Sequence, residues 1–177
     1  MNELRQINVA VIGAGWVGGI RAHACADSAF VDRLHIAEIK PERAAEIAAE
    51  TGAASVTDDW TTLLDDPEID AFIIASTPES SRFPIVRAAL QAGKHVMVEK
   101  PIAPTPEEAD EAIALADAGN LKLTVGYTRR FDPKYAYINK AIKSGAIGEP
   151  VTCLVSRNIT REIGAKIKGR SKMSPAA

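Results

Sequence analysis

The chain has 177 residues, of which 46% are hydrophobic and 25% charged, and its formal net charge is −2. This length suits one full domain, or one domain with part of a second, and the charge gives no general case for nucleic-acid binding. The longest uncharged stretch, Gln6 to Ile20, contains glycines and is too short to span a bilayer. The residues before it lack the basic-then-apolar pattern of a signal peptide. We therefore predict a cytoplasmic protein with neither nucleic acid nor membrane as a partner.

The first apolar run, Ile7 to Ile12, predicts a strand that is buried on both faces of a parallel sheet. A turn with three glycines follows, and a helix is predicted from Trp16 to about Asp27. Its apolar positions Val17, Ile20 and Ala24 are expected to share one face. The two cysteines of the chain, at positions 25 and 153, are expected to be reduced packing residues, because nothing indicates secretion.

The glycines between this strand and helix have G-x-G-x-x-G spacing and predict a phosphate site. The first permits the tight turn, the second lacks the Cβ that would block a pyrophosphate, and the third lets helix and strand pack closely. Backbone N–H groups and the positive end of the helix dipole then receive the phosphate charge. A glycine turn with a purely structural role is the alternative that the spacing alone leaves open. The cofactor-binding candidates here are Gly13, Gly15, Trp16, Val17 and Gly18.

A second strand, Leu34 to Ala37, is predicted to end at Glu38, which lies 20 residues after Gly18. A carboxylate in this place accepts hydrogen bonds from ribose hydroxyls and repels a 2′-phosphate, which favours NAD over NADP. Lys40 and Arg43 follow closely and leave NADP open. A solvated acid at the strand end is the alternative to a cofactor-binding role for Glu38.

The remaining pattern alternates strands with helices, which predicts an α/β fold with a Rossmann-type doubly wound parallel sheet. Pro41 fits the first turn of a helix, and further helices are expected after Asp58 or Asp59 and after Thr105, where Glu108 completes a capping box. The expected strands are residues 54–56, 69–75, 95–98 and 121–125, and the expected helices are residues 42–50, 60–64, 81–92 and 106–119. Thr77 and Glu99 follow two of the strands, at the sheet edge where open α/β sheets bind ligands.

Several later stretches carry a family resemblance. Residues 90–101 resemble the A-G-K-H-V-x-x-E-K-P signature of the Gfo/Idh/MocA oxidoreductases, and residues 75–79 are similar to that family's A-T-P-N turn. Residues 126–133 resemble the segment that leads from the cofactor domain into the substrate domain, and residues 144–150 continue it. Within the family, the R-R-F-D-P stretch is most similar to inositol 2-dehydrogenases.

The resemblance implies NAD(P)-dependent oxidation of a sugar or cyclitol hydroxyl, so that the small-molecule partner is a sugar or polyol. Lys100 would be the catalytic lysine that orients the substrate hydroxyl and tunes proton removal, helped by a pKa lowered among apolar strand residues. A strand-end cation without a catalytic role is the alternative. Thr77, Pro78 and Glu99 would line the nicotinamide side.

Two residues depart from the family pattern within the cofactor domain. Glu79 replaces the usual Asn of the T-P-N turn, and Arg82 replaces the His that commonly follows it three residues later. We expect either change to alter cofactor affinity without destroying the fold.

The resemblance also predicts the domain organisation: residues 1–126 as the NAD(P)-binding Rossmann domain, and residues 127–177 as a linker helix, the incomplete start of a substrate domain and a basic tail. Residues 151–156 are expected to form that domain's first strand. Residues 157–177 contain six basic residues and one acid, a local charge of +5, and are expected to be flexible or weakly helical.

Family members carry an Asp and a His in the substrate domain, whereas this sequence has no Asp after Asp132 and no His after His95. We therefore expect a truncated chain whose activity alone is uncertain, and a frameshift or early stop would explain its ending. The alternative is a non-catalytic dinucleotide-binding module or a degenerate product. The sequence specifies neither the substrate nor the oligomeric state, and oligomerisation stays open.

Overall fold

The computed structural model describes residues 5–156 and 158–165, and these form two units, one ending at Tyr127 and the other beginning at Thr128. The first unit contains a six-stranded sheet in the order β3-β2-β1-β4-β5-β6, with every neighbouring pair parallel. This order confirms the predicted doubly wound sheet. The strands are β1 (Ile7–Ile12), β2 (Val31–Ala37), β3 (Ser55–Thr57), β4 (Ala71–Ile74), β5 (His95–Val98) and β6 (Leu123–Val125).

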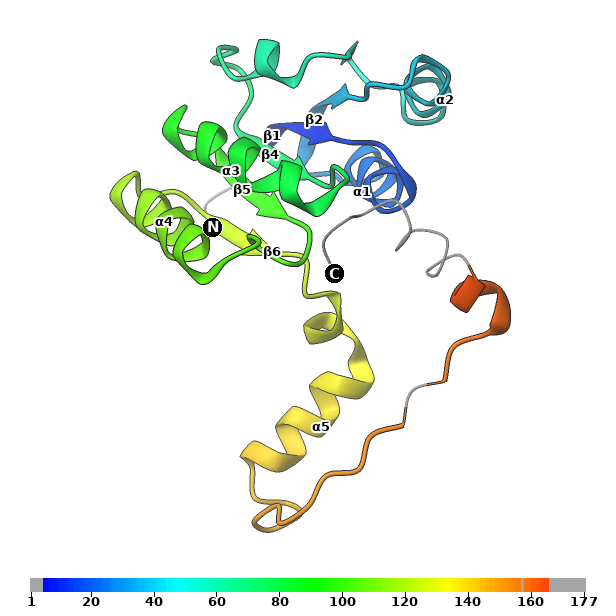
Figure 1. The fold of residues 1–177 in the computed structure, drawn as a ribbon, viewed down its shortest axis with the longest axis vertical. Helices are drawn as coiled ribbons and strands as arrows, with labels where there is room; N and C mark the ends of the chain where they lie inside the picture. The colour runs from blue at the N-terminus through cyan, green and yellow to red at the C-terminus, as the bar shows by residue number, and fades with distance from the viewer. Residues whose placement is uncertain (1–4, 157, 166–177) are drawn as a thin grey trace. The chain divides into compact units, whose positions relative to one another are not determined.

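Helices cover both faces of this sheet, α1 and α2 on one side and α3 and α4 on the other (Figure 1). Alternate residues of β1 point to opposite faces, so Val9 and Val11 join the apolar cluster under α1, while Ala10 and Ile12 join the cluster under α3 and α4. Burial on both faces explains the continuous apolar run. The helices are α1 (Trp16–Ala26), α2 (Pro41–Thr51), α3 (Arg82–Gln91) and α4 (Pro106–Ala118), with short 3₁₀ turns at Trp60–Leu63 and Glu79–Ser81.

The apolar positions Val17, Ile20 and Ala24 of α1 are not the residues that pack on the sheet. Ile20 is 53% exposed, Ala24 is exposed and Val17 is only half-buried. The face that packs on the sheet instead consists of small side chains, Gly18, Gly19, Ala22 and Cys25. Glycines let the helix lie too close to β1 and to α2 for larger side chains to fit, so here close packing overrides apolar periodicity.

Both predicted N-cap residues, Asp59 and Thr105, accept a backbone hydrogen bond, but Glu108 does not complete the predicted capping box: its Oε2 has no hydrogen-bond partner among the described residues. Asp59 accepts a hydrogen bond from the Thr61 N–H, and Thr105 Oγ1 accepts one from the Glu108 N–H at 3.3 Å. Gly52 ends α2 with a φ of +64°, a conformation that glycine adopts without steric cost.

The second unit begins with a 3₁₀ turn at Thr128–Phe131 and continues into α5 (Pro133–Lys143), which Asp132 caps. Residues 151–156 form no strand in the described part of the chain, contrary to prediction, and Val151 and Leu154 are 94% and 96% exposed. A strand requires hydrogen bonds to a neighbouring strand, and the described residues provide none for this segment. Of the predicted basic tail, Arg157 and residues 166–177 lie outside the described residues, and residues 161–165 are helical.

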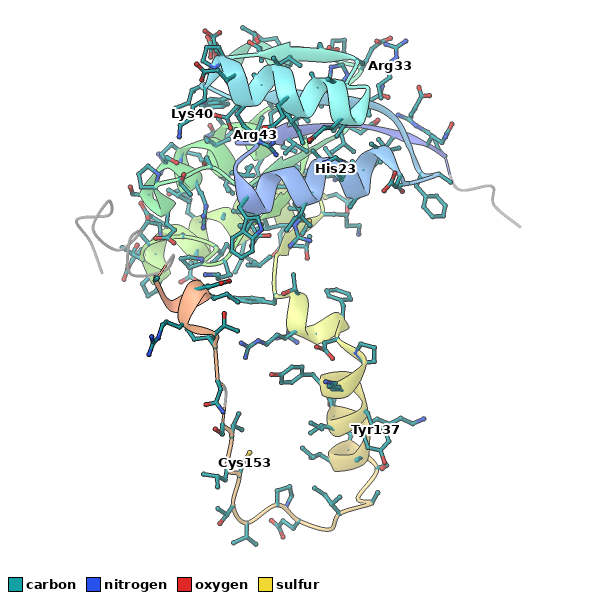
Figure 2. The ribbon with its side chains drawn as sticks, turned by 90° about the vertical axis from the view of Figure 1, so that its right-hand side faces the viewer. His23, Arg33, Lys40, Arg43, Tyr137 and Cys153 are labelled. Atoms are coloured by element: carbon teal, nitrogen blue, oxygen red, sulfur yellow. The ribbon has the colours of Figure 1, made fainter. Side chains whose placement is uncertain are left out.

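Both cysteines have free thiols in the described structure. Cys25 is buried in α1, as predicted for a packing residue, but Cys153 is exposed on the extended segment (Figure 2). The packing role predicted for Cys153 is therefore wrong.

A buried histidine makes the stability of the first unit depend on pH. The His35 side chain lies in β2 with Nδ1 2.8 Å from Ser55 Oγ and with Nε2 lacking a partner among the described residues. Burial lowers the pKa of His35 from its ordinary value of 6.5, and the nearby carboxylates of Asp66 and Glu68 only partly oppose this. The unfolded chain therefore binds a proton at a pH where the folded chain does not, so stability is lost as pH falls below 6.5.

We expect His35→Gln to reduce the stability that the chain loses as the pH falls below 6.5. The midpoint of thermal unfolding of wild type, followed by circular dichroism, should fall more steeply than that of the variant between pH 6.5 and about pH 5. His23→Gln is the control, because His23 is exposed on α1 beside Glu50 (Figure 2). Equal slopes for wild type and His35→Gln would contradict the expectation.

Candidate functional site

The first part of the site is the turn after β1. Gly13 has a φ of +83°, and a Cβ at this position would lie 2.8 Å from the Ser76 Cα. A side chain here would therefore be strained and would also collide with the chain that follows β4. Gly18 is equally constrained, because a Cβ on it would overlap the Gly13 carbonyl oxygen. These two glycines bring β1, α1 and the end of β4 into contact.

Gly15 differs from these two glycines. Its backbone has a φ of −61°, which any residue adopts, and no described atom lies within 4 Å of the place a Cβ would occupy. Gly15 is also the N-cap of α1, and no described side chain caps the helix there. The helix therefore begins without a capping side chain from its N-cap residue, next to an open space. Trp16 and Val17 form the first residues of this helix.

The Ala14 peptide, between these glycines, is held on both sides by the second βα unit. The Ala14 N–H donates to Glu38 Oε2 at 2.7 Å, and Arg43 Nε donates to the Ala14 carbonyl oxygen at 2.7 Å. Glu38 follows β2 directly, is only 8% exposed, and also accepts a hydrogen bond from the Lys40 N–H. Glu38 is therefore fixed beside the glycine turn.

The two cations near Glu38 have different surroundings. Arg43 extends from α2 toward α1 (Figure 2), and its Nη1 lies 2.6 Å from Glu46 Oε2 and 3.9 Å from Glu50 Oε2. Two carboxylates and a carbonyl thus surround its guanidinium. The side chain of Lys40 is exposed, and no ion pair within the described residues involves it.

The turn after β4 contains Thr77 and Pro78, which are exposed and joined by a cis peptide bond. Ser81 holds this turn: its hydroxyl donates to the Pro78 carbonyl at 2.7 Å and lies 3.0 Å from Ser76 Oγ. The backbone of this turn borders the glycine turn through Ser76.

Glu99 follows β5 and forms a buried ion pair with Arg21 of α1. Its Oε1 accepts hydrogen bonds from Arg21 Nη2 at 2.6 Å and Nε at 3.1 Å, and the two side chains are 10% and 19% exposed. Gly126, after β6, leaves room for this carboxylate, since a Cβ there would lie 2.7 Å from Glu99 Oε1. Arg21 was not predicted as a site residue. Its one signal was a charged residue three positions after Gly18, on the side of α1 that packs inward.

Lys100, the predicted catalytic residue, lies next to Glu99 at the carboxyl edge of the sheet. Its side chain is exposed, whereas the sequence analysis placed it among apolar strand residues. Its carbonyl oxygen accepts a hydrogen bond from Arg82 Nη1 at 2.7 Å. No ion pair within the described residues involves its ammonium. Lys100 thus lies at the carboxyl edge with its side chain exposed.

A second lysine of the same signature has a different role. Lys94 is 7% exposed, and its ammonium donates to the carbonyl oxygens of Asp66 and Ile69 at 2.6 and 2.9 Å. These contacts satisfy a buried charge and tie the start of β5 to the segment before β4. Lys94 therefore stabilises the fold away from the carboxyl edge.

Within residues 5–156 and 158–165, no group of three or more metal-binding side chains gathers. No helix in the same described ranges has the length and apolar character needed to cross a membrane.

Comparison with known proteins places these features in a family. Residues 7–127 match the model of the Gfo/Idh/MocA oxidoreductase family, NAD-binding Rossmann fold. The chain is 37% identical over 155 residues to levoglucosan dehydrogenase of Pseudarthrobacter phenanthrenivorans, covering 82% of this chain and 39% of that protein. It is 34% identical over 161 residues to the NAD⁺-dependent scyllo-inositol 2-dehydrogenase of Bacillus subtilis, covering 90% and 46%.

A solved structure shows the same architecture. The scyllo-inositol dehydrogenase of Lactobacillus casei, with bound NAD(H) and scyllo-inositol, superposes with a TM-score of 0.76 at 29% identity. The superposition covers 82% of this chain and 43% of that one. The chain thus spans less than half the length of the relatives it matches.

Proposed function

The chain belongs to the Gfo/Idh/MocA oxidoreductase family with its NAD-binding Rossmann fold, and from this premise we propose that it binds NAD(H) at the carboxyl edge of its sheet. The observation that carries the proposal is the open space at Gly15, over the uncapped start of α1 and beside the carboxylate of Glu38. A pyrophosphate fits such a space because the N-terminus of a helix presents backbone N–H groups and the positive end of the helix dipole to phosphate oxygens.

Each candidate residue has a place in this binding mode. Gly13 and Gly18 shape the turn, while Gly15 and the N–H groups of Trp16 and Val17 receive the pyrophosphate. Glu38 accepts from the ribose hydroxyls with the lone pairs that Ala14 and Lys40 leave unused. The residues assigned to the nicotinamide side are Thr77, Pro78 and Glu99, the last acting through its ion pair with Arg21.

The charges near Glu38 favour NAD over NADP. A 2′-phosphate would meet the Glu38 carboxylate, and Arg43 is already paired with Glu46. Lys40 remains as the one exposed cation of this group.

The relatives act on inositol or levoglucosan according to their names, which supports a sugar or cyclitol hydroxyl as the substrate. The nicotinamide, when bound, supplies the hydride acceptor for oxidation of that alcohol. Lys100 is the residue of this chain that would orient the hydroxyl and assist removal of its proton. Its exposed ammonium at the end of β5 supports this assignment.

The domain assignment belongs to the same proposal. We assign residues 1–126 to the cofactor domain and residues 127–177 to the linker helix and the start of the substrate domain. The change of structural unit after Tyr127 supports a boundary in this place.

The proposal is tested by titrating NADH and NADPH into the full chain and following tryptophan fluorescence. Saturable NADH binding, with NADPH at least about tenfold weaker, is the expected result. Failure of both nucleotides to bind would overturn the proposal. An assay with NAD and a panel of inositols and aldoses then separates an oxidoreductase from a dinucleotide-binding module, which binds NADH without turnover.

Neutralising Glu38 should change the cofactor preference. We expect Glu38→Gln to weaken NADH binding and strengthen NADPH binding. The dissociation constant of NADPH divided by that of NADH should therefore fall by about tenfold. The reason is that the amide no longer repels a 2′-phosphate and accepts weaker hydrogen bonds from the ribose. Glu42→Gln, at an exposed position of α2, serves as the charge-matched control. A ratio that changes equally in both variants would show that only net charge matters.

A further inference from the structure

Arg82, the first residue of α3, joins two strand ends of the site. It is 6% exposed, its Nε donates to the Ser76 carbonyl oxygen at 2.8 Å, and its Nη1 donates to the Lys100 carbonyl oxygen at 2.7 Å. Ser76 follows β4, and Lys100 follows β5. One guanidinium therefore holds the two polypeptide segments that would meet the nicotinamide and the substrate.

The connection extends to a third strand end. The Ser76 backbone lies against Gly13, close enough that a Cβ on Gly13 would be 2.8 Å from the Ser76 Cα. The glycine turn is also held independently of Arg82, because Glu38 and Arg43 bind the Ala14 peptide. Arg82 therefore joins the ends of β4 and β5 directly and reaches the end of β1 only through Ser76.

The surroundings of Arg82 suit a positioning role. Burial lowers the pKa of its guanidinium, and the carboxylates of Glu79 and Glu99 partly oppose this, so the group remains charged at neutral pH. No carboxylate among the described residues lies within ion-pair distance of it. Its guanidinium instead donates to two backbone carbonyl oxygens. Charge-assisted hydrogen bonds of this kind are stronger than neutral ones, so they hold the two backbone segments in a defined orientation.

We propose that Arg82 is a positioning residue that fixes the Ser76–Pro78 turn and Lys100 relative to each other, and so shapes the nicotinamide half of the site. This inference rests on the proposed NAD(H) binding. It predicts that Arg82 matters for the nicotinamide half and not for the ADP-ribose half, which contacts Gly15 and Glu38. A residue that only stabilised the fold would affect both halves alike.

The test compares two ligands, NADH and ADP-ribose, which lacks the nicotinamide. Their dissociation constants are measured by calorimetry for wild type, Arg82→Gln and Arg82→Lys. We expect Arg82→Gln to weaken NADH binding by about tenfold, through loss of charged hydrogen bonds, and to leave ADP-ribose binding within about twofold. Arg82→Lys keeps the charge but has one donor group for two carbonyls, so partial rescue is expected.

Arg87→Gln is the matched control. Arg87 lies on the same helix but is exposed and pairs with Glu111 of α4 at 2.6 Å. This variant should leave both dissociation constants unchanged. If Arg82→Gln does not fold, as judged by circular dichroism, Arg82→Lys provides the same comparison between NADH and ADP-ribose.

The outcomes distinguish a failure of the positioning role of Arg82 from a failure of the proposed NAD(H) binding. Equal weakening of NADH and ADP-ribose, or no effect on either, would overturn the positioning role while leaving NAD(H) binding intact. If wild type bound neither ligand, the proposed function itself would fail. Selective loss of NADH affinity would support the role of Arg82.

Discussion

Gly15→Ala is expected to abolish measurable NADH binding while the chain remains folded. The backbone at Gly15 has a φ of −61°, which alanine adopts, and no described atom lies near the position of the new Cβ. The added methyl group would nevertheless occupy the space over the start of α1 that we assign to the pyrophosphate. A loss of at least about a hundredfold in NADH affinity is expected, because the steric overlap leaves no close approach to the N–H groups.

Thermal unfolding by circular dichroism and NADH titration together check this result. Gly164→Ala is a matched control, since alanine there meets only Ile159 Cδ1 at 3.8 Å, and it should change neither measurement. Gly18→Ala should behave differently from both, because its Cβ would overlap the Gly13 carbonyl, and this variant should lose stability as well as binding. Normal NADH affinity in Gly15→Ala would place the pyrophosphate elsewhere.

Arg21→Met should strongly destabilise the chain. It leaves the Glu99 carboxylate, which is 10% exposed, without the guanidinium 2.6 Å away. Removing one partner of a buried ion pair costs about 3–5 kcal/mol, because the remaining charge is neither solvated nor paired. Denaturant unfolding of wild type and variant measures this difference in the free energy of unfolding.

Two further variants test whether the lost stability comes from the unpaired, buried charge of Glu99. Arg21→Met combined with Glu99→Gln should recover more than half of the lost stability, because no unpaired charge remains. Arg33→Met removes an equally short pair with Glu68, but both side chains there are more than half exposed, so little change is expected. If Arg21→Met and Arg33→Met had equal effects, burial of the Arg21–Glu99 pair would not be important for stability.

The fold was predictable because its signals are local. The continuous apolar run of β1 indicated burial on both faces, and the alternation of strands with helices indicated a doubly wound parallel sheet. Parallel strands place their carboxyl ends at one edge, so the residues after β1, β2, β4 and β5 could be assigned to a common site. On α1 the apolar pattern did not indicate which residues pack on the sheet, because small side chains form the buried face there.

Residues 151–156 show a different limit. Their apolar character predicted a strand, yet they are exposed and form none in the described structure. A helix forms its hydrogen bonds within one segment, but a strand depends on a partner elsewhere, so composition alone cannot establish it.

The sequence by itself determined the sheet, the glycine turn, the acid after β2 and the lysine after β5, since each depends on residues close together in the chain. Only the tertiary structure decided what holds these parts in place. Arg21 meets Glu99 across 78 positions, Ala14 meets Glu38 across 24, and Arg82 meets the Lys100 carbonyl across 18. No periodicity or spacing rule specifies such contacts, because they exist only once the helices have packed against the sheet and brought distant side chains to its carboxyl edge.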